Sequence, residues 1–411
     1  MFRYVILKKV LWINHFVPFP PKGGLLIRTN GLLAGVGLEH KIYLLAMIQP
    51  RLFKSYFSNA QEGIEKCKKA LGGIVTEQEF IPFEAENYGM GRLLPLVQSL
   101  FSVSAYSVVW LRNKQLKQRI RELLASEHFD VIHLDTMELI ESLPPTNVPI
   151  VINHHNAEHE MLLRRAAKES SLLKKILFRF EALKLAKFYR KNMHKAALHL
   201  ACSKEDILSL TKFSPSSRFE LVPNGVPVGD TPLPSRSKKL LFVGGLDWYP
   251  NRDAIEVFLE SAWPLISETI PDISLEIIGK NPSEKILQLA KKYSNVAVLG
   301  FVDDISLNYK NVLAFICPLR DGGGTKLKVI DAMANRLPVI GSDIAFEGIA
   351  VSHLENGLVA NNIDEIISCI NVLKSDSTSW DRISSGAYSL VKKQYDVSAI
   401  AKKYAGILQS V

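Results

Sequence analysis

Short apolar segments rich in Val, Ile and Leu alternate along the chain with longer segments in which apolar residues recur at helical spacing. Continuous apolar runs of this length are typical of strands buried on both faces of a parallel sheet, so the pattern predicts an α/β fold. We expect strands at Tyr4–Asn14, Lys41–Met47, Asp130–Asp135, Pro149–Asn153, Leu198–Ser203 and Phe219–Pro223, and a second series at Lys239–Gly244, Ser274–Gly279, Val296–Gly300, Val312–Pro318 and Pro338–Ser342.

The segment 223–237, PNGVPVGDTPLPSRS, separates the two strand series and is dense in Pro, Gly and Ser, as linkers are. A chain of 411 residues also exceeds the usual size of a single hydrophobic core. We therefore predict an N-terminal domain at 1–223 and a C-terminal domain at 224–396, each a doubly wound parallel sheet. Ligands of such sheets bind beyond the carboxyl ends of the strands, which favours a site in a shared cleft.

Composition adds little to this picture, since 47% hydrophobic and 22% charged residues are ordinary values for a folded protein. The start, MFRYVILKKVLWINHF, has an apolar run broken by Lys8 and Lys9 and no small-residue cleavage site, so we expect no signal peptide and a cytoplasmic location. The cysteines form no CxxC pair, which argues against a disulfide framework or a cysteine-based zinc site; they are Cys67, Cys202, Cys317 and Cys369.

The formal net charge is +9, and Met161–Lys195 alone holds eleven Lys/Arg against two Glu. Within it, Leu172–Lys195 predicts a basic amphipathic helix whose apolar positions are Leu173, Ile176, Leu177, Phe180 and Leu183. The helix either packs on its own sheet with a solvated charged face or contacts anionic lipid at the inner membrane face. Nucleic acid is not expected as a partner, because the chain has no aromatic-interleaved basic motif and no zinc-finger spacing.

Leu93–Leu111, LLPLVQSLFSVSAYSVVWL, carries no charge and is long enough to suggest a membrane span. It contains Pro95, Gln98 and four serines. A span here would also place strands of one sheet on opposite sides of a membrane. The sequence therefore favours a helical insertion that is interfacial or packed on the core.

A glycine-rich loop, Gly322–Gly324, follows the apolar run Val312–Leu319 and precedes a predicted helix. Glycines allow the backbone to approach a ligand closely, and the start of a helix favours an anion, so phosphate is the expected ligand. The alternative is an ordinary strand-to-helix turn. The loop is neither a Walker loop nor GxGxxG. Thr325, Lys328 and Asp331 are spaced by three and should share one helix face, which suits a nucleotide diphosphate, whereas an exposed Lys–Asp pair would carry no function.

Several motifs of the second half resemble glycosyltransferase family 4, which has the GT-B fold of two Rossmann-like doubly wound parallel-sheet domains facing each other across a cleft. These motifs are FVGGLDWYPNRDAI (242–255), LEIIGK (275–280), LGFVDDI (299–305), CPLRDGGGTKLKVIDAMANRLPVIGS (317–342) and ENGLVA (355–360). The first half resembles the family more weakly, through FPPKGG (19–24), HHNAEHE (154–160), ACSKED (201–206) and LVPNGV (221–226).

The resemblance implies a retaining transfer of sugar from a UDP- or GDP-sugar to a saccharide or lipid-linked acceptor, in bacterial surface polysaccharide or glycolipid synthesis. It implies no tightly bound metal and no other cofactor. The N-terminal domain would hold the acceptor, and the last helix, near Val397–Leu408, would cross back to that domain.

The resemblance also implies a donor site formed by Gly244, Gly245, Val302, Gly323, Gly324, Thr325, Lys328 and Asp331. Two departures from the family pattern stand out. Relatives often have glutamates at the places of Gly323 and Asp331, and many have an arginine at the place of Gly245. Lys328 then carries more of the diphosphate charge, with Arg252 as a distant helper.

In the N-terminal domain, the backbone N–H groups of Gly23 and Gly24 are candidates for binding the acceptor or a phosphate. His155 resembles the family histidine near the reacting sugar, where it would orient donor hydroxyls or the acceptor. Its neighbour His154 is interpreted as a packing residue.

Two alternatives remain at the level of sequence. His155-Asn156-Ala157-Glu158-His159 matches H-x-x-E-H, the inverted zinc-protease motif, which requires a helix at His155 and a third metal ligand. The second alternative is a catalytically silent scaffold that binds nucleotide sugars, suggested by the two departures from the family pattern.

Overall fold

The computed structural model describes residues 7–87 and 93–411. The chain forms two compact units: unit 1 extends to Pro223 and includes Ser398–Val411, and unit 2 is Asn224–Val397. Each unit has one sheet in which every pairing of neighbouring strands is parallel. The predicted fold class, two doubly wound parallel sheets, is confirmed.

The sheet of unit 1 has the strand order β3-β2-β1-β4-β5-β6-β7 among the described residues. Its strands are β1 (Lys9–Asn14), β2 (Lys41–Ile48), β3 (Glu77–Pro82), β4 (Val131–Leu134), β5 (Ile150–His154), β6 (Leu198–Ala201) and β7 (Phe219–Leu221). The predicted strand Tyr4–Asn14 corresponds to β1, and its residues 4–6 lie outside the described residues.

The helices of unit 1 come mainly between successive strands. They are α1 (Gly24–Gly37), α2 (Pro50–Lys54), α3 (Ala60–Leu71), α4 (Glu84–Asn87), α5 (Leu93–Leu100), α6 (Tyr106–Trp110), α7 (Lys114–Ser126), α8 (Glu158–Lys168), α9 (Leu172–Asn192), α10 (Lys204–Thr211) and α17 (Val397–Leu408), with 3₁₀ turns η1 (Met137–Ser142) and η2 (Met193–Lys195).

The sheet of unit 2 has the order β10-β9-β8-β11-β12-β13. Its strands are β8 (Lys239–Val243), β9 (Ser274–Ile278), β10 (Val296–Gly300), β11 (Ala314–Cys317), β12 (Val339–Gly341) and β13 (Leu358–Val359). Its helices are α11 (Tyr249–Val257), the π-helical turn η3 (Phe258–Ala262), α12 (Trp263–Thr269), α13 (Glu284–Ala290), α14 (Leu327–Ala334), α15 (Ile363–Ser375) and α16 (Ser377–Gln394).

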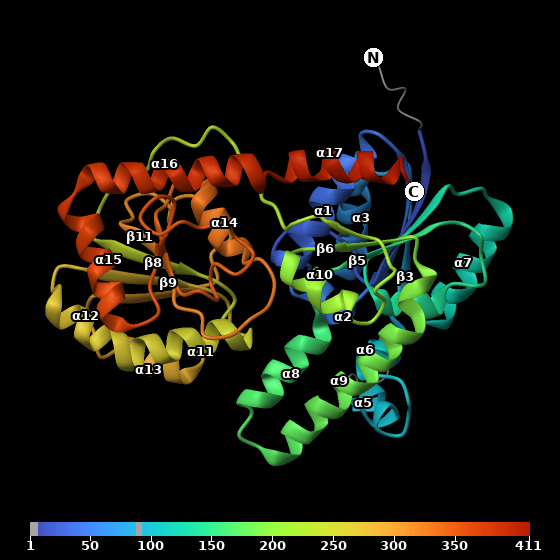
Figure 1. Ribbon diagram of the computed structural model, residues 1–411, viewed down its shortest axis with the longest axis horizontal. Helices are drawn as coiled ribbons and strands as arrows, with labels where there is room; N and C mark the ends of the chain where they lie inside the picture. Colours follow the sequence, from blue (N-terminus) through green and yellow to red (C-terminus); the bar gives the residue numbers. More distant parts are fainter. Residues whose placement is uncertain (1–6, 88–92) are drawn as a thin grey trace. The chain divides into compact units, whose positions relative to one another are not determined.

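Helices cover both faces of each sheet, so each unit has two apolar layers. In unit 2, residues of α12, α13 and α15 join one layer and residues of α14 join the other, while α11 and α16 contribute to both (Figure 1). Burial on both faces explains why the central strands are continuous apolar runs rather than alternating ones.

The last helix, α17, packs on the sheet of unit 1 after the chain has completed unit 2 (Figure 1). Its Tyr404 Oη lies 2.5 Å from Nδ1 of His133 on β4, and the Ala405 carbonyl lies 2.9 Å from Nε2 of His40. These buried polar contacts fix α17 at one position along the unit.

Gly35 on α1 is where α17 approaches most closely, because a Cβ at Gly35 would lie 2.2 Å from Cβ of buried Ala401. We expect Gly35→Ala to lower the free energy of unfolding by ~1–3 kcal/mol, as overpacking does. The matched control is Gly406→Ala on α17, where an added Cβ meets nothing within 4 Å and should be neutral or stabilising. Urea-induced unfolding measures both, and equal midpoints would contradict the close packing.

The structure adds two strands to those expected from the sequence. The strands β3 and β13 were not predicted. Leu93–Leu111, predicted as a helical insertion, forms two short helices, α5 and α6, joined by a turn. Among the described residues, no helix has the length and apolar character needed to cross a bilayer.

Candidate functional site

The strand orders place a topological switch point in each unit. In unit 1 the order reverses between β1 and β4, and in unit 2 between β8 and β11. Chains leaving the carboxyl ends of two such strands turn to opposite faces of the sheet, which opens a crevice where ligands bind. The candidate residues should therefore follow these strands.

Three ionisable side chains meet at the switch point of unit 1. His15 follows β1, Asp135 follows β4 and His155 follows β5. His155 Nε2 lies 3.2 Å from Asp135 Oδ2, and His15 Nδ1 lies 3.8 Å from the same oxygen. Asp135 is fully buried, whereas the side chains of both histidines keep a small exposed fraction. One buried carboxylate thus faces two histidines that reach the surface.

Neighbouring polar groups hold Asp135 in place. The Asn153 amide donates to Asp135 at 3.2 Å, and the Thr29 hydroxyl donates to it at 3.3 Å. Arg28 of α1 donates to Asn153 Oδ1 at 2.9 Å and to the Pro223 carbonyl at 2.8 Å. The carboxylate therefore has a fixed orientation toward His155.

Burial and the neighbouring histidines shift the pKa of Asp135 in opposite directions. Burial alone would raise the pKa of Asp135, but the adjacent His155 outweighs burial and holds the pKa below its usual value. Burial lowers the pKa of His15 to about 4, partly opposed by Asp135. His15 Nδ1 is buried without a hydrogen-bond partner among the described residues.

The predicted loop at Gly23 and Gly24 forms the start of α1. Gly23 has φ +89°, a conformation that favours glycine, and no side chain caps the helix. The first turn of α1 also has no acidic residue. These features leave the helix start suited to an anionic or hydroxyl-rich ligand.

In unit 2, the glycine-rich loop connects β11 to α14. Gly322 has φ +128° and Gly324 has φ +66°, conformations that favour glycine, while Gly323 adopts an ordinary φ. The helix begins at Leu327, and Thr325 lies before it. The expectation that Thr325, Lys328 and Asp331 share one helix face is therefore wrong for Thr325, whose backbone carbonyl accepts from Asn224 at 3.3 Å.

Lys328 is connected to the Gly244–Gly245 turn through Asn251. The Lys328 ammonium donates to Asn251 Oδ1, and Asn251 Nδ2 donates to the Gly245 carbonyl at 2.8 Å. The ammonium also lies 4.6 Å from the ring centroid of Phe242. Burial lowers the pKa of Lys328, and the nearby ammonium of Lys326 adds to this effect.

Lys328 has no carboxylate partner among the described residues. The neighbouring Lys326 differs, because it pairs with Glu347 at 3.0 Å and donates to the Gly324 carbonyl at 2.6 Å. Lys326 thus stabilises the glycine-rich loop, while the charge of Lys328 remains available for an anion.

Asp331 accepts a hydrogen bond from the hydroxyl of Tyr309, a buried residue. Burial raises the pKa of Asp331, and the contact with Tyr309 opposes this effect. Lys328 and Asp331 form no ion pair in the described part of the chain, so the alternative of an exposed Lys–Asp pair is wrong. The two side chains point to different partners on the same helix.

Two further candidates make no side-chain hydrogen bond or ion pair within the part of the chain that the structure describes. Val302 follows β10 and is partly buried against the apolar layer that contains α14. Arg252 lies next to Asn251 at the start of α11 and is also partly buried.

The H-x-x-E-H alternative is contradicted by the structure. His155 lies before α8, which begins at Glu158, so His155 and His159 do not share a helix face. His159 is buried and lies 3.2 Å from the Ser209 hydroxyl. No group of three or more His, Cys, Asp or Glu in residues 7–87 and 93–411 is placed to hold a metal ion.

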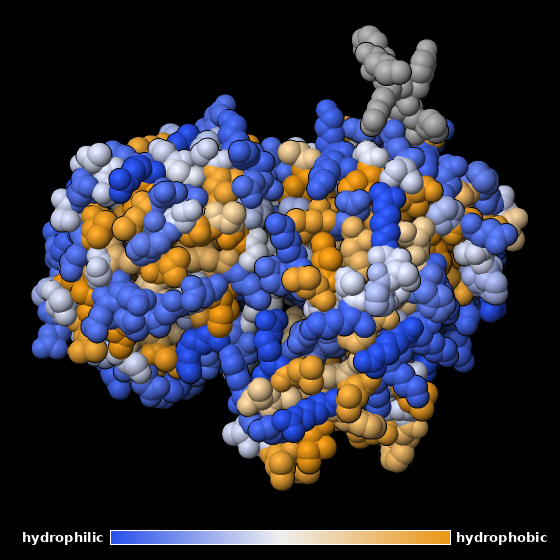
Figure 2. Space-filling model, viewed as in Figure 1, coloured by the Kyte–Doolittle hydropathy of each residue, from blue (hydrophilic) through white to orange (hydrophobic). Residues whose placement is uncertain are grey.

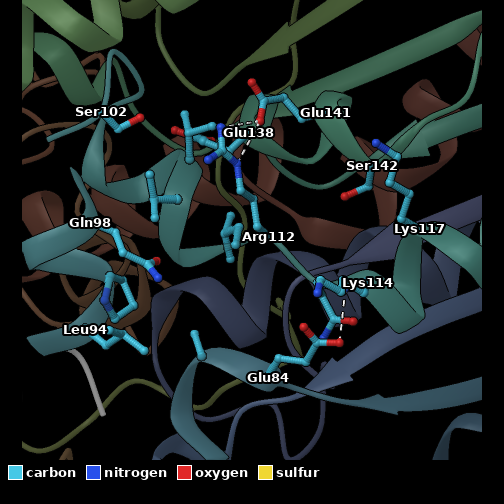
Figure 3. Close-up of a pocket in the computed structure, with 16 residues that line it drawn as sticks. Glu84, Leu94, Gln98, Ser102, Arg112, Lys114, Lys117, Glu138, Glu141 and Ser142 are labelled. Atoms are coloured by element: carbon cyan, nitrogen blue, oxygen red, sulfur yellow. Dashed lines mark hydrogen bonds and ion pairs between the residues drawn. The ribbon is translucent and has the colours of Figure 1, made fainter. Parts of the chain in front are cut away.

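Unit 1 also contains a cavity of about 680 Å³ bordered by α5, α6, α7 and η1 (Figure 3). Several of its polar groups are already paired. Arg112 donates to Glu141 at 3.1 Å, and Glu84 accepts from the Lys114 backbone N–H at 3.1 Å. These internal pairs make it a weaker candidate for polar recognition than the switch points.

The sequence analysis missed His15, Asp135, Asn251 and Tyr309. Asp135 and His15 could have been found from their places directly after buried apolar runs, since carboxyl ends of neighbouring parallel strands meet. Asn251 and Tyr309 gave no such signal, because their contacts with α14 join segments far apart in the sequence.

Comparisons with known proteins agree with this geometry. Residues 237–376, within unit 2, match the model of the family described as glycosyl transferases group 1. The chain is 24% identical over 296 residues to an uncharacterized 44.6 kDa protein in the cps region of Klebsiella pneumoniae, across 68% of this chain and 74% of that protein.

Among solved structures, the chain is similar to sucrose-phosphate synthase from Thermosynechococcus elongatus, with a TM-score of 0.70, 14% identity, and 98% and 99% of the two chains covered. HepE from Anabaena in complex with UDP-glucose gives a TM-score of 0.62, 14% identity, and coverage of 98% and 100%. A TarM variant from S. aureus in complex with fondaparinux, α-GlcNAc-glycerol and UDP gives a TM-score of 0.67 and 12% identity, with 98% of this chain and 100% of that chain covered. These similarities span both units and show the GT-B fold.

Proposed function

We propose that this protein is a retaining glycosyltransferase that transfers a sugar from a nucleotide diphosphate to a saccharide or lipid-linked acceptor. The family match in unit 2 and the GT-B fold support glycosyl transfer. The similarity to a protein of the cps region supports a role in polysaccharide synthesis.

The observation that carries the proposal is the Lys328 ammonium at the switch point of unit 2. It is partly buried, and its hydrogen bond goes to a neutral amide. Holding a cation in such a place costs free energy unless an anion compensates it. A diphosphate would supply that negative charge. Its oxygens would also accept hydrogen bonds from backbone N–H groups at the start of α14, where no side chain caps the helix.

The remaining donor contacts are assigned as part of the same proposal. Gly244, Gly245 and the loop Gly322–Gly324 would let the backbone approach the sugar diphosphate, and Thr325 lies at the end of that loop. Asp331, oriented by Tyr309, would accept bonds from ribose hydroxyls. Val302 would contact the base. The HepE and TarM structures contain UDP-glucose and UDP, which favours UDP over GDP as the nucleotide.

In unit 1, His155 would orient hydroxyl groups near the reacting carbon, with its ring fixed by Asp135. Gly23 and Gly24 would contact the acceptor or a phosphate. In a retaining front-face transfer, an oxygen of the leaving diphosphate takes the acceptor proton, so positioning and charge stabilisation supply most of the catalysis. This scheme requires no bound metal.

A thermal-shift screen against UDP, GDP and their sugars tests the proposal. A nucleotide at a hundred times its dissociation constant should stabilise the protein by ~2.7 kcal/mol, and we expect the largest shifts with UDP compounds. Adenosine serves as the control ligand. No shift with any nucleotide would overturn the proposal, and binding without transfer to any acceptor would favour the silent scaffold.

A further inference from the structure

The first half of α9 exposes a stripe of apolar side chains. Leu172, Leu173, Ile176, Phe180 and Leu183 are all exposed, Leu173 to 81%. At 3.6 residues per turn these five positions fall within an arc of about 100°. The sequence predicted an amphipathic helix with almost the same apolar set, which would either pack on the sheet or contact anionic lipid, and the structure shows these side chains exposed. The buried contacts of α9 lie in its second half instead, at Ala182, Leu185, Phe188 and Tyr189.

A second exposed segment lies beside this stripe. The turn between α5 and α6 exposes Phe101 to 90% and Val103 to 79%, and Leu100 precedes them. Figure 2 shows apolar side chains mixed with hydrophilic ones over the part of unit 1 formed by α5, α8 and α9. We name Leu100, Phe101, Val103, Leu172, Leu173, Ile176, Phe180 and Leu183 together the apolar surface.

A buried ion pair joins the two segments. Glu181 and Lys184 of α9 lie 3.0 Å apart with both side chains buried. Lys184 Nζ donates to the Ser99 carbonyl at 2.5 Å, and Glu181 accepts from the Tyr106 backbone N–H at 2.5 Å. The same Nζ lies 4.3 Å from the ring centroid of Phe180. The turn after α5 is therefore held against the middle of α9.

Basic side chains border the apolar surface. Lys174, Arg179 and Lys187 on α9 are exposed, as is Arg165 on α8. Of the two acidic residues in Met161–Lys195, Glu181 is paired with Lys184, so only Glu169, between α8 and α9, offsets these cations. An exposed apolar stripe bordered by cations matches the interface of an anionic bilayer, which takes up both. A second copy of the same surface fits poorly, since it would bring cations against cations.

We propose that the apolar surface and its basic border dock the protein on an anionic lipid bilayer, with α9 lying in the plane of the interface. The docking does not depend on the proposed glycosyl transfer. It would bring unit 1 to the place where a lipid-linked acceptor is held.

Co-sedimentation of the full chain with vesicles tests the apolar part. We expect wild-type protein to bind vesicles of phosphatidylcholine with phosphatidylserine and not vesicles of phosphatidylcholine alone. The double variant Leu173→Ser, Ile176→Ser should bind at least roughly tenfold more weakly, because two inserted side chains are lost. The matched control Leu38→Ser, Leu208→Ser changes two exposed leucines of unit 1 outside the surface and should bind like wild type.

The double variant Lys174→Glu, Arg179→Glu tests the basic border. It should bind the vesicles at least roughly tenfold more weakly than wild type. Raising the salt concentration from about 0.1 M to about 1 M should weaken wild-type binding in the same way. Lys69→Glu, Lys402→Glu is the control with the same change of net charge at exposed sites of unit 1. All altered positions are exposed, so melting temperatures should match wild type.

Three results would overturn the proposal: no binding to any vesicle, equal binding of test and control variants, or binding indifferent to phosphatidylserine and salt. Sedimentation equilibrium without lipid adds a fourth. A dimer that is lost in Leu173→Ser, Ile176→Ser would mean that a second copy covers the surface.

Discussion

Replacing His155 with alanine is expected to slow sugar transfer by about 10²–10⁴-fold while leaving the affinity for the nucleotide nearly unchanged. His155 belongs to unit 1, whereas Lys328 and Asp331, the proposed contacts of the diphosphate and the ribose, belong to unit 2. Its ring lies against buried Asp135, so it is held in one orientation and can position a reacting hydroxyl without reorganising. Transfer rates from UDP-sugars and calorimetric titration of UDP measure the two effects separately.

Asp135→Asn is the companion variant, because it keeps the size of the side chain and removes the charge that faces His155. The ring would lose the charged acceptor that fixes it, so transfer should fall by at least about tenfold with UDP affinity retained. The matched control is His128→Ala. His128 is exposed and precedes the amino end of β4, at the opposite end of the strand from Asp135. Wild-type transfer by His155→Ala would remove His155 from the reaction.

The sequence predicted the buried strands well because their apolar runs do not depend on neighbours. It missed β3, of whose residues Glu77–Pro82 half are polar and which lies at the edge of the sheet. It also missed β13, which is only Leu358–Val359. Such strands depend on the pairing offered by an existing sheet, so local pattern cannot reveal them.

The spacing of residues along the sequence also could not predict which side chains contact the candidate site residues. It placed Lys328 and Asp331 on one helix, yet their partners, Asn251 and Tyr309, come from elsewhere in the chain. On α9, spacing identified the apolar stripe but not whether it packs, because burial depends on which elements lie opposite. Tertiary contacts therefore decided the partners of residues that the sequence had already singled out.

Lys328→Met is expected to weaken UDP binding by ~1.5–3 kcal/mol and to leave the affinity for uridine nearly unchanged. Methionine retains much of the apolar stem beside Phe242 but removes the ammonium. Because that ammonium has a neutral partner in the absence of ligand, its removal should not lower the melting temperature of the free protein and is expected to raise it. Lys291→Met, at an exposed site of unit 2, is the control and should change neither property.

Asp331→Asn should give a different pattern, since the amide keeps an acceptor for Tyr309 but loses the charged contact with ribose hydroxyls. We expect it to weaken UDP and uridine by similar amounts, about 1–2 kcal/mol, because both ligands contain the ribose. Calorimetric titration of both ligands into both variants distinguishes the assignments. If Lys328→Met and Asp331→Asn remain folded and bind UDP like wild type, the donor diphosphate and ribose do not lie at the start of α14. If both variants lose UDP and uridine equally, Lys328 supports the shape of the site through Asn251 and does not contact the diphosphate.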